Sequence, residues 1–438
     1  MYISLSDRSG GKRDNSKSAT TALKGAVPFR LSPVILWLGI VSMVTDVSSE
    51  SVTAILPLYV TGFLGLSTIA FGFIDGINQG ASAIVRIAAG WAADRSGHPK
   101  RIALAGYGLS MLARIGFLFA GGFWAIAAIV TGDRIGKGIR TAPRDALITV
   151  SAQPEHLARS FGMHRMLDNI GAAAGPLIAF LVLLLIPNGF STVFVVSLAF
   201  AVIGVTILGL VVPDVRADGI REAQPKRRLF AFSWSQLKEP GLGRLLIAAG
   251  LLGLVTIGDG FIYLVLQDRD SFAVQWFPLL FVGTNVVFLL LAVPLGRLAD
   301  RFGKVPVFVG GHLALLACYF LAAAPLGGVW ATASCLVLLG AFYAATDGVL
   351  AALASQLTPA GKLATGIASA QTVVALTRMA ASAGFGVLWY AVGASSAVLI
   401  AGTALGAAVV AVIFILPGAR PKSGARPKPG ARPKQGNA

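Results

Sequence analysis

The sequence predicts an all-α membrane protein with twelve transmembrane helices in two similar six-helix halves. Three observations lead to this prediction. The 438 residues are 55% hydrophobic and only 13% charged, whereas about a quarter of the residues in a soluble domain are charged. Twelve segments are apolar over roughly the 20 residues that a helix needs to cross a bilayer. A charged motif recurs at equivalent places in the two halves of the chain.

Each expected helix starts where a long apolar run follows a polar or turn-forming stretch. The first run is long and lacks a preceding small-residue cleavage site, so it is not expected to be a cleaved signal peptide. The expected first residues of the twelve helices are, in order, Pro33, Thr68, Ile102, Trp124, Ala158, Phe190, Gly243, Ala273, Val305, Val329, Ala364 and Ser395.

Shifts in composition divide the chain into five parts. A basic cytoplasmic tail, 1–31, precedes the first six-helix bundle, 32–212; a polar cytoplasmic linker, 213–242, precedes the second bundle, 243–416. The last part, 417–438, repeats Gly-Ala-Arg-Pro-Lys and is too rich in Pro and Gly to bury a core. We expect this tail to be disordered, either without a dedicated role or in contact with anionic lipid headgroups.

The net charge of +17 is distributed unevenly along the chain. Basic residues gather in the tails, in the linker and after the second and eighth helices, whereas the opposite connections contain only Arg269. This positive-inside pattern predicts an even number of spans in an inner (plasma) membrane, with both termini cytoplasmic. The placement of the charge beside spans argues against nucleic acid as a partner.

An internal repeat supports the division into halves. GWAADRSGHPKR after the second helix is similar to GRLADRFGKVPV after the eighth. Four positions correspond at an offset of 206 residues: Gly90 with Gly296, Asp94 with Asp300, Arg95 with Arg301, and Gly97 with Gly303.

These two loops resemble the hallmark G-x-x-x-D-R-x-G of the major facilitator superfamily, and the resemblance covers about residues 31–416. The resemblance implies the fold of that superfamily, twelve helices in two six-helix halves. It also implies that the eight repeated residues form a conformational latch. In the latch, Asp94 would face the start of helix eleven near 359–362, and Asp300 would face the start of helix five near Glu155. The alternative is that both loops are ordinary basic turns.

Two further motifs resemble those of proton-coupled members of the superfamily. RIGKGIR, from Arg134, resembles the helix-four motif R-x-x-Q-G-x-G, with Lys137 in place of Gln and Arg140 in place of the second Gly. GAAAGP resembles the helix-five antiporter motif G-x-x-x-G-P; the alternative is a close helix contact between small residues. Its matching residues are Gly171, Gly175 and Pro176. The stretch DRIGKGIRTAPRDALI also resembles a drug:proton antiporter-like bacterial branch.

The fourth expected helix carries charges deep within the span. Asp133 lies about 14 Å along the helix from Trp124, near the membrane midplane. A charge at this depth costs several kcal/mol unless it has a partner or a water-filled cavity. We expect Arg140 and Arg144 to lie near the cytoplasmic surface, where long side chains reach the headgroups.

Four residues are therefore candidates for proton coupling. Asp133, with Arg134 or Lys137, is as consistent with a structural ion pair as with a coupling site. Asp46 and Glu50 lie one turn apart on a helix with no cation of its own, so each needs a proton or a partner on another helix. The candidates are Asp46, Glu50, Asp133 and Arg134.

The resemblance also implies that helices one, four, seven and ten line a central cavity. Candidates for contact with substrate in it are Lys137, Arg114, Asp259, Asp347 and Arg378. Asp75, on the second helix, is not assigned a role.

The sequence predicts a secondary active transporter that works by alternating access, with proton-coupled efflux of a small organic compound as the favoured function. The alternative is uptake or exchange of an organic anion attracted by Lys137, Arg114 and Arg378. We expect no enzyme activity, because no nucleophile–base pair or metal cluster is visible and GDRIGK does not have P-loop spacing. The expected partners are a small-molecule substrate, protons and lipid, with no cofactor or metal, and we expect a monomer.

Cysteine labels test the predicted topology. Ser18→Cys and Gln435→Cys should react with a membrane-impermeant maleimide only after the cytoplasmic side is exposed, because the flanking basic residues resist translocation. Labelling of either site in intact cells would contradict a model with an even number of spans.

Overall fold

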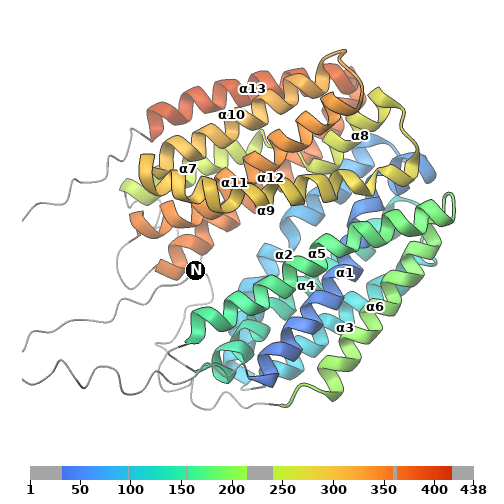
Figure 1. Cartoon of the computed structure of the whole chain (residues 1–438), viewed down its shortest axis with the longest axis vertical. Coiled ribbons are helices and arrows are strands. Elements are labelled where there is room, and N and C mark those ends of the chain that lie inside the picture. Colours follow the sequence, from blue (N-terminus) through green and yellow to red (C-terminus); the bar gives the residue numbers. More distant parts are fainter. Residues whose placement is uncertain (1–31, 97, 154–155, 215–239, 359–362, 417–438) are drawn as a thin grey trace, which may run out of the picture. The chain divides into compact units, whose positions relative to one another are not determined.

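The computed structural model describes residues 32–96, 98–153, 156–214, 240–358 and 363–416 (Figure 1). The described residues are helical apart from short connections. The predicted tails 1–31 and 417–438, and nearly all of the predicted linker, lie outside these ranges.

Six helices precede the linker. The first ends in a π-helical turn, Tyr59–Phe63. The helices are α1 (Pro33–Leu58), α2 (Thr68–Ser96), α3 (Pro99–Phe117), α4 (Phe123–Ser151), α5 (Leu157–Leu185) and α6 (Phe190–Leu210).

Six further spans follow the linker. The seventh is made of two helices, α7 and α8, and a short 3-10 turn, Val274–Trp276, precedes the eighth. The helices are α7 (Pro240–Leu254), α8 (Asp259–Asp270), α9 (Pro278–Phe302), α10 (Lys304–Ala323), α11 (Val329–Leu357), α12 (Leu363–Val392) and α13 (Ala394–Ile415).

The predicted fold class, an all-α membrane protein with twelve spans, is confirmed. Within the described ranges, nine helical segments are long and apolar enough to cross a membrane by composition alone, and α7 and α8 together form one of them. The remaining three spans, α2, α3 and α4, are less apolar, and α4 contains all six charges of the stretch Gly132–Ile148.

The seventh span is broken, which the sequence analysis missed when it expected one continuous helix from Gly243. Residues between Leu254 and Asp259 leave the helix, and Gly258 is extended at φ −65° and ψ 145°. The hydroxyl of Tyr319 accepts a hydrogen bond from Ile257 N at 2.9 Å, which satisfies one backbone group that the break frees. A Cβ at Gly260 would lie 2.8 Å from the Phe71 ring, so close packing requires glycine there.

The chain packs as two compact units. One contains Ile84–Ala120 and the described residues of Met1–Thr53 and Ala128–Leu229. The other contains Ala54–Ala83, Gly121–Ala127 and the described residues of Phe230–Ala438. The predicted bundles 32–212 and 243–416 stay a prediction, because most of the linker lies outside the described residues.

Each unit has its own core. In the first, aliphatic side chains of α1, α3, α4 and α6 pack around Tyr107. In the second, Phe71, Phe261 and Phe385 form a run of edge-to-face rings, with centroids 4.7 Å and 4.9 Å apart. This aromatic packing joins α2, α8 and α12 around the break in the seventh span.

Candidate functional site

In the first unit, α1 and α4 face each other through a column of polar pairs, which we call the charge ladder. Its three rungs are Glu50 with Lys137 (3.5 Å), Asp46 with Arg140 (3.4 Å) and Ser42 with Arg144 (3.2 Å). From one rung to the next, the residue number on α1 decreases by four, while the residue number on α4 increases by three or four. That spacing keeps one face of each helix in register with the other.

Beyond the Glu50 rung lies a cluster of one acid and two cations. Asp133 accepts from Arg114 at 2.8 Å and from Arg134 at 2.7 Å. Arg114, on α3, also donates to the hydroxyls of Ser48 and Ser49 on α1. All three charged side chains are buried, so the hydrogen bonds of this cluster offset a large desolvation cost.

At the other end of the ladder, Arg144 reaches α5. Its guanidinium donates to Asp145 at 3.0 Å and lies 3.6 Å from Asp168. Arg165 pairs with the same Asp168 at 3.6 Å. The ladder therefore ends in contacts with two acids and a serine.

The prediction that the Arg140 and Arg144 side chains reach toward the headgroups is wrong, while their position near the cytoplasmic surface of the membrane stays a prediction. Their side chains are only 3% and 7% exposed. Arg140 lies over the Tyr107 ring, 4.5 Å from its centroid, and pairs with Asp46. The partners come from three other helices, and spacing along α4 alone cannot reveal them.

Asp46 and Glu50 have cations opposite them on α4. Asp46 is buried against Arg140, whereas the Glu50 and Lys137 side chains are 26% and 32% exposed. Of the three rungs, the Glu50 rung is the one whose two members both reach solvent-accessible space.

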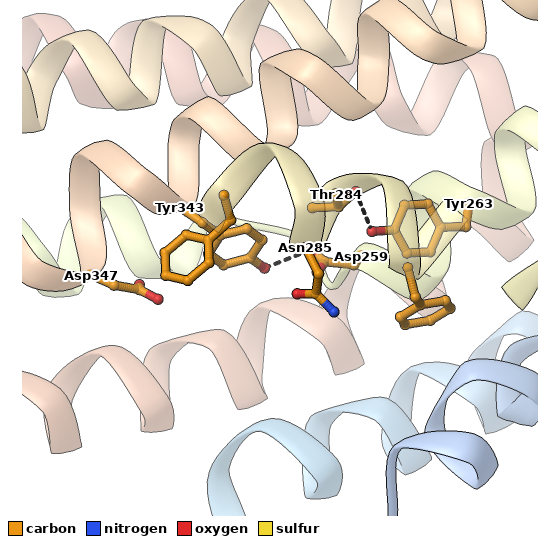
Figure 2. A pocket seen from close by; sticks show the side chains of 8 residues that line it. Asp259, Tyr263, Thr284, Asn285, Tyr343 and Asp347 are labelled. Carbon is orange, nitrogen blue, oxygen red and sulfur yellow. Dashed lines mark hydrogen bonds between the residues drawn. The ribbon is translucent and has the colours of Figure 1, made fainter. Parts of the chain in front are cut away.

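The second unit holds a polar, aromatic pocket of about 220 Å³ (Figure 2). The break in the seventh span places Asp259 at the start of α8, where its carboxylate accepts a hydrogen bond from Tyr343 at 2.6 Å. Tyr263 donates to Thr284 at 2.7 Å. The pocket is lined by Asp259, Tyr263, Phe281, Thr284, Asn285, Phe288, Tyr343 and Asp347.

Two carboxylates but no basic side chain belong to this lining. Arg378 lies behind Tyr343, with its guanidinium 5.5 Å from the ring centroid. Arg378 and Asp347 also line a smaller neighbouring cavity of about 30 Å³ with His312. The two acids and Arg378 together carry a formal net charge of −1.

The structure brings together some of the predicted substrate contacts and separates others. Asp259, Asp347 and Arg378 gather around the pocket of the second unit, whereas Arg114 and Lys137 belong to the charge ladder region of the first. Sequence analysis missed the aromatic members of the pocket. The available signal was a tyrosine within an apolar stretch of each helix, Tyr263 in FIYLVL and Tyr343 in GAFYAA.

Half of the predicted latch lies outside what the structure describes. The parts outside the described residues are the side chains of Asp94 and Arg95, Gly97, and the expected partner segments at Glu155 and 359–362. In the second copy, the Asp300 side chain is 78% exposed and lies 3.8 Å from Lys304. The latch stays a prediction for both copies.

The other residues of the second copy shape the end of α9. Gly303 ends the helix at φ 101°, a conformation that favours glycine. Arg301 stacks on Phe302, and the space around Gly296 is open. Gly90, in the first copy, lies within α2.

The helix-five motif forms a close contact between α5 and α1. A Cβ on Gly175 would lie 2.8 Å from Ser51 N, and one on Gly171 would overlap the Met43 carbonyl. Pro176 lies within α5. These contacts agree with the small-residue alternative, while the antiporter role stays a prediction.

Twelve spans that enclose ion pairs and a polar pocket define a membrane transporter fold. The family model of the Major Facilitator Superfamily matches residues 38–285 and 267–435. The chain therefore belongs to the major facilitator superfamily.

Two relatives have similar sequences. An uncharacterized MFS-type transporter of Methanocaldococcus jannaschii is 27% identical over 374 residues, which cover 82% of this chain and 89% of that protein. An uncharacterized protein of Mycobacterium tuberculosis is 32% identical over 140 residues, or 32% of this chain and 34% of that one.

Solved structures with the same fold include several transporters. The nucleoside transporter NupG has a TM-score of 0.73 at 14% identity and covers 88% of this chain and 99% of its own. A POT family transporter in complex with 5-aminolevulinic acid has a TM-score of 0.71 at 13% identity, with 87% and 96% covered. A bacterial homologue of Spinster has a TM-score of 0.68 at 16% identity, with 89% and 96% covered. At such identities the likeness shows the fold alone.

Removing the central acid should destabilise the first unit. Asp133→Asn leaves Arg114 and Arg134 buried without their carboxylate, and we expect a loss of about 3–5 kcal/mol in the free energy of unfolding. Denaturant titration in detergent measures it. As a control, Asp300→Asn removes an exposed ion pair and should cost less than about 1 kcal/mol. Equal stability of the two variants would contradict a structural role for Asp133.

Proposed function

We propose that the protein is a secondary active transporter that exports a small organic compound in exchange for protons by alternating access. It would work as a monomer in the inner (plasma) membrane with both termini cytoplasmic. The charge ladder is the observation that carries this proposal. It places acids within reach of cations inside spans, and one rung is accessible.

The Glu50 rung suits reversible protonation. While Glu50 is ionised, its carboxylate neutralises Lys137 at 3.5 Å. Protonation of Glu50 removes that attraction and leaves the lysine to seek another partner, so a proton changes the contact between α1 and α4. Asp46 supports the adjacent rung and is the second candidate carrier. The motifs on helices four and five, with their resemblance to proton-coupled antiporters, support the same direction of coupling.

The pocket of the second unit suits an organic cation with an apolar part. Asp259 and Asp347 offer negative charge, and a cation over an aromatic ring gains about 0.5–2 kcal/mol. Phe281, Phe288 and the two tyrosines supply such rings. The transporters of similar fold, one for nucleosides and one in complex with 5-aminolevulinic acid, support a small organic compound as substrate.

Transport of an organic anion is less well supported. Arg114 already bonds Asp133 and two serines, and Lys137 pairs with Glu50. Among the cations proposed for an anion, Arg378 is the one for which the described residues provide no carboxylate within ion-pair distance. Its Nε is buried without a hydrogen-bond partner.

The repeated loops fit the same proposal as a latch. Asp94 and Asp300 would stabilise one conformation of the cycle through the ends of neighbouring helices. The glycines at these loops would allow the close approach that the latch needs.

A transport screen tests the substrate class. Proteoliposomes with the purified full chain are offered amines, organic anions and uncharged compounds, with and without an imposed pH gradient. We expect accumulation of amines that depends on the gradient, and its loss in Asp259→Asn through weaker binding. Accumulation of anions that is lost in Arg378→Gln would overturn the efflux proposal in favour of anion transport.

Removal of a carrier carboxylate should separate coupling from binding. Glu50→Gln should reduce gradient-driven accumulation at least tenfold, because the rung no longer takes up a proton, while substrate counterflow persists. Asp46→Asn should lose part of both activities, because it also leaves Arg140 buried without its acid. Asp268→Asn, an exposed acid outside the site, is the matched control. Full gradient-driven accumulation in Glu50→Gln and Asp46→Asn would exclude both as the carrier.

A further inference from the structure

The first half of α2 packs directly on the backbone of α12 within the second unit. Three glycines at intervals of four residues make this contact. A Cβ on Gly72 would lie 2.6 Å from the Ser382 carbonyl, one on Gly76 2.7 Å from the Met379 carbonyl, and one on Gly80 2.8 Å from Met379 Cβ. No side chain fits between the helices at these positions, so α2 and α12 are in close contact along this stretch.

Asp75 lies beside this glycine contact and is only 7% exposed. Its Oδ2 lies 2.6 Å from the hydroxyl oxygen of Ser382 on α12. The same oxygen touches Gly258, at the break between α7 and α8, so closely that a Cβ there would overlap it. We call this meeting point of α2, α12 and the helix break the Asp75 junction.

Asp75 differs from the other buried acids in lacking a cation partner. Asp46 and Asp133 each pair with an arginine, whereas no Lys, Arg or His of the described residues is within ion-pair distance of Asp75. A carboxylate buried without a cation is costly, and a proton removes that cost. Ser382 can donate to the carboxylate or accept from the acid, so its hydroxyl tolerates either form.

The charged neighbours of Asp75 have opposite effects on a negative charge at its carboxylate. Asp259, on α8, repels a charge on Asp75, while Arg378, on α12, attracts one; Gln79 is its polar neighbour on α2. The N-terminus of α8 at Gly258 also favours negative charge. The part of the first span in this unit, the end of α1 from Ala54 and the π-helical turn Tyr59–Phe63, has no charged side chain.

We propose that Asp75 is a proton-binding site whose protonated form holds α2 against α12 and the break in the seventh span. The carboxylate takes up one proton and releases it again, with no other bond made or broken. Loss of the proton leaves a charge in the sealed contact and weakens it. The inference rests on the proposed proton coupling for its role in transport, but the contact itself depends only on pH.

Two spin labels report the state of the junction. Phe73 on α2 and Val387 on α12 have exposed side chains, so Phe73→Cys and Val387→Cys can be labelled while the buried native cysteines, Cys318 and Cys335, stay unreacted. Double electron–electron resonance measures the distance between the two labels. The full chain is reconstituted in nanodiscs without substrate, at pH values between 5 and 9.

We expect a short separation at low pH and a growing longer population as pH rises. If one proton controls the contact, the ratio of the two populations changes up to about tenfold per pH unit. In Asp75→Asn, which is neutral at every pH and keeps a partner for Ser382, the short separation should persist to pH 9. Glu50→Gln should retain the pH response of the labelled chain that carries no further substitution.

An unchanged pH response in Asp75→Asn, or no response in the unmodified chain, would overturn the proposal. Size-exclusion elution confirms that each labelled variant is folded. Ser382→Ala provides a second check, because loss of the hydroxyl should shift the response without abolishing it; complete insensitivity to this change would also count against the junction. The label distances are measured without substrate, so they do not depend on whether the protein exports substrate. A failure of proton-driven export would be detected separately, in the proteoliposome assay.

Discussion

The cost of placing charge inside a membrane governs the first unit. α4 brings three arginines, a lysine and two aspartates into a span, and each must find a partner. Arg134 and Asp145 find their partners within α4 itself, and the polar faces of α1, α3 and α5 supply the others, from Glu50 at one end of the ladder to Asp168 at the other. The helices therefore pack in one register, because a shift by one residue would turn the acids of α1 away from the cations of α4.

In the second unit, the backbone groups left unpaired at the helix break determine the packing, as the charges of α4 do in the first unit. The break frees backbone groups that must be satisfied without water, and Tyr319 supplies one partner. It also brings Asp259 to the first turn of α8, where the carboxylate faces Tyr343 and the pocket. The same four-residue interruption thus positions Asp259 in the pocket lining and, through Gly258, forms one side of the Asp75 junction.

Much of the fold could be predicted from the sequence, because the length of an apolar run is a local property. The first residues expected for the first, second, sixth and tenth spans, Pro33, Thr68, Phe190 and Val329, agree with the structure. The break in the seventh span was missed because both halves are apolar, although Gly258 followed by an acid was a visible signal. The ladder partners were also missed, because pairing depends on how neighbouring helices are registered and rotated.

Two kinds of acid coexist within the spans of the protein, and they place different demands on a transport cycle. An acid that faces a cation, such as Glu50 opposite Lys137, can lose its charge only if the cation finds another partner, so protonation and movement of the cation are linked. An acid without a cation, such as Asp75, changes only its own contacts when it is protonated. The first kind suits exchange between proton and substrate, since a cationic substrate can replace the proton electrostatically. The second suits control of a helix contact, since no cation has to find another partner when the proton is gained or lost.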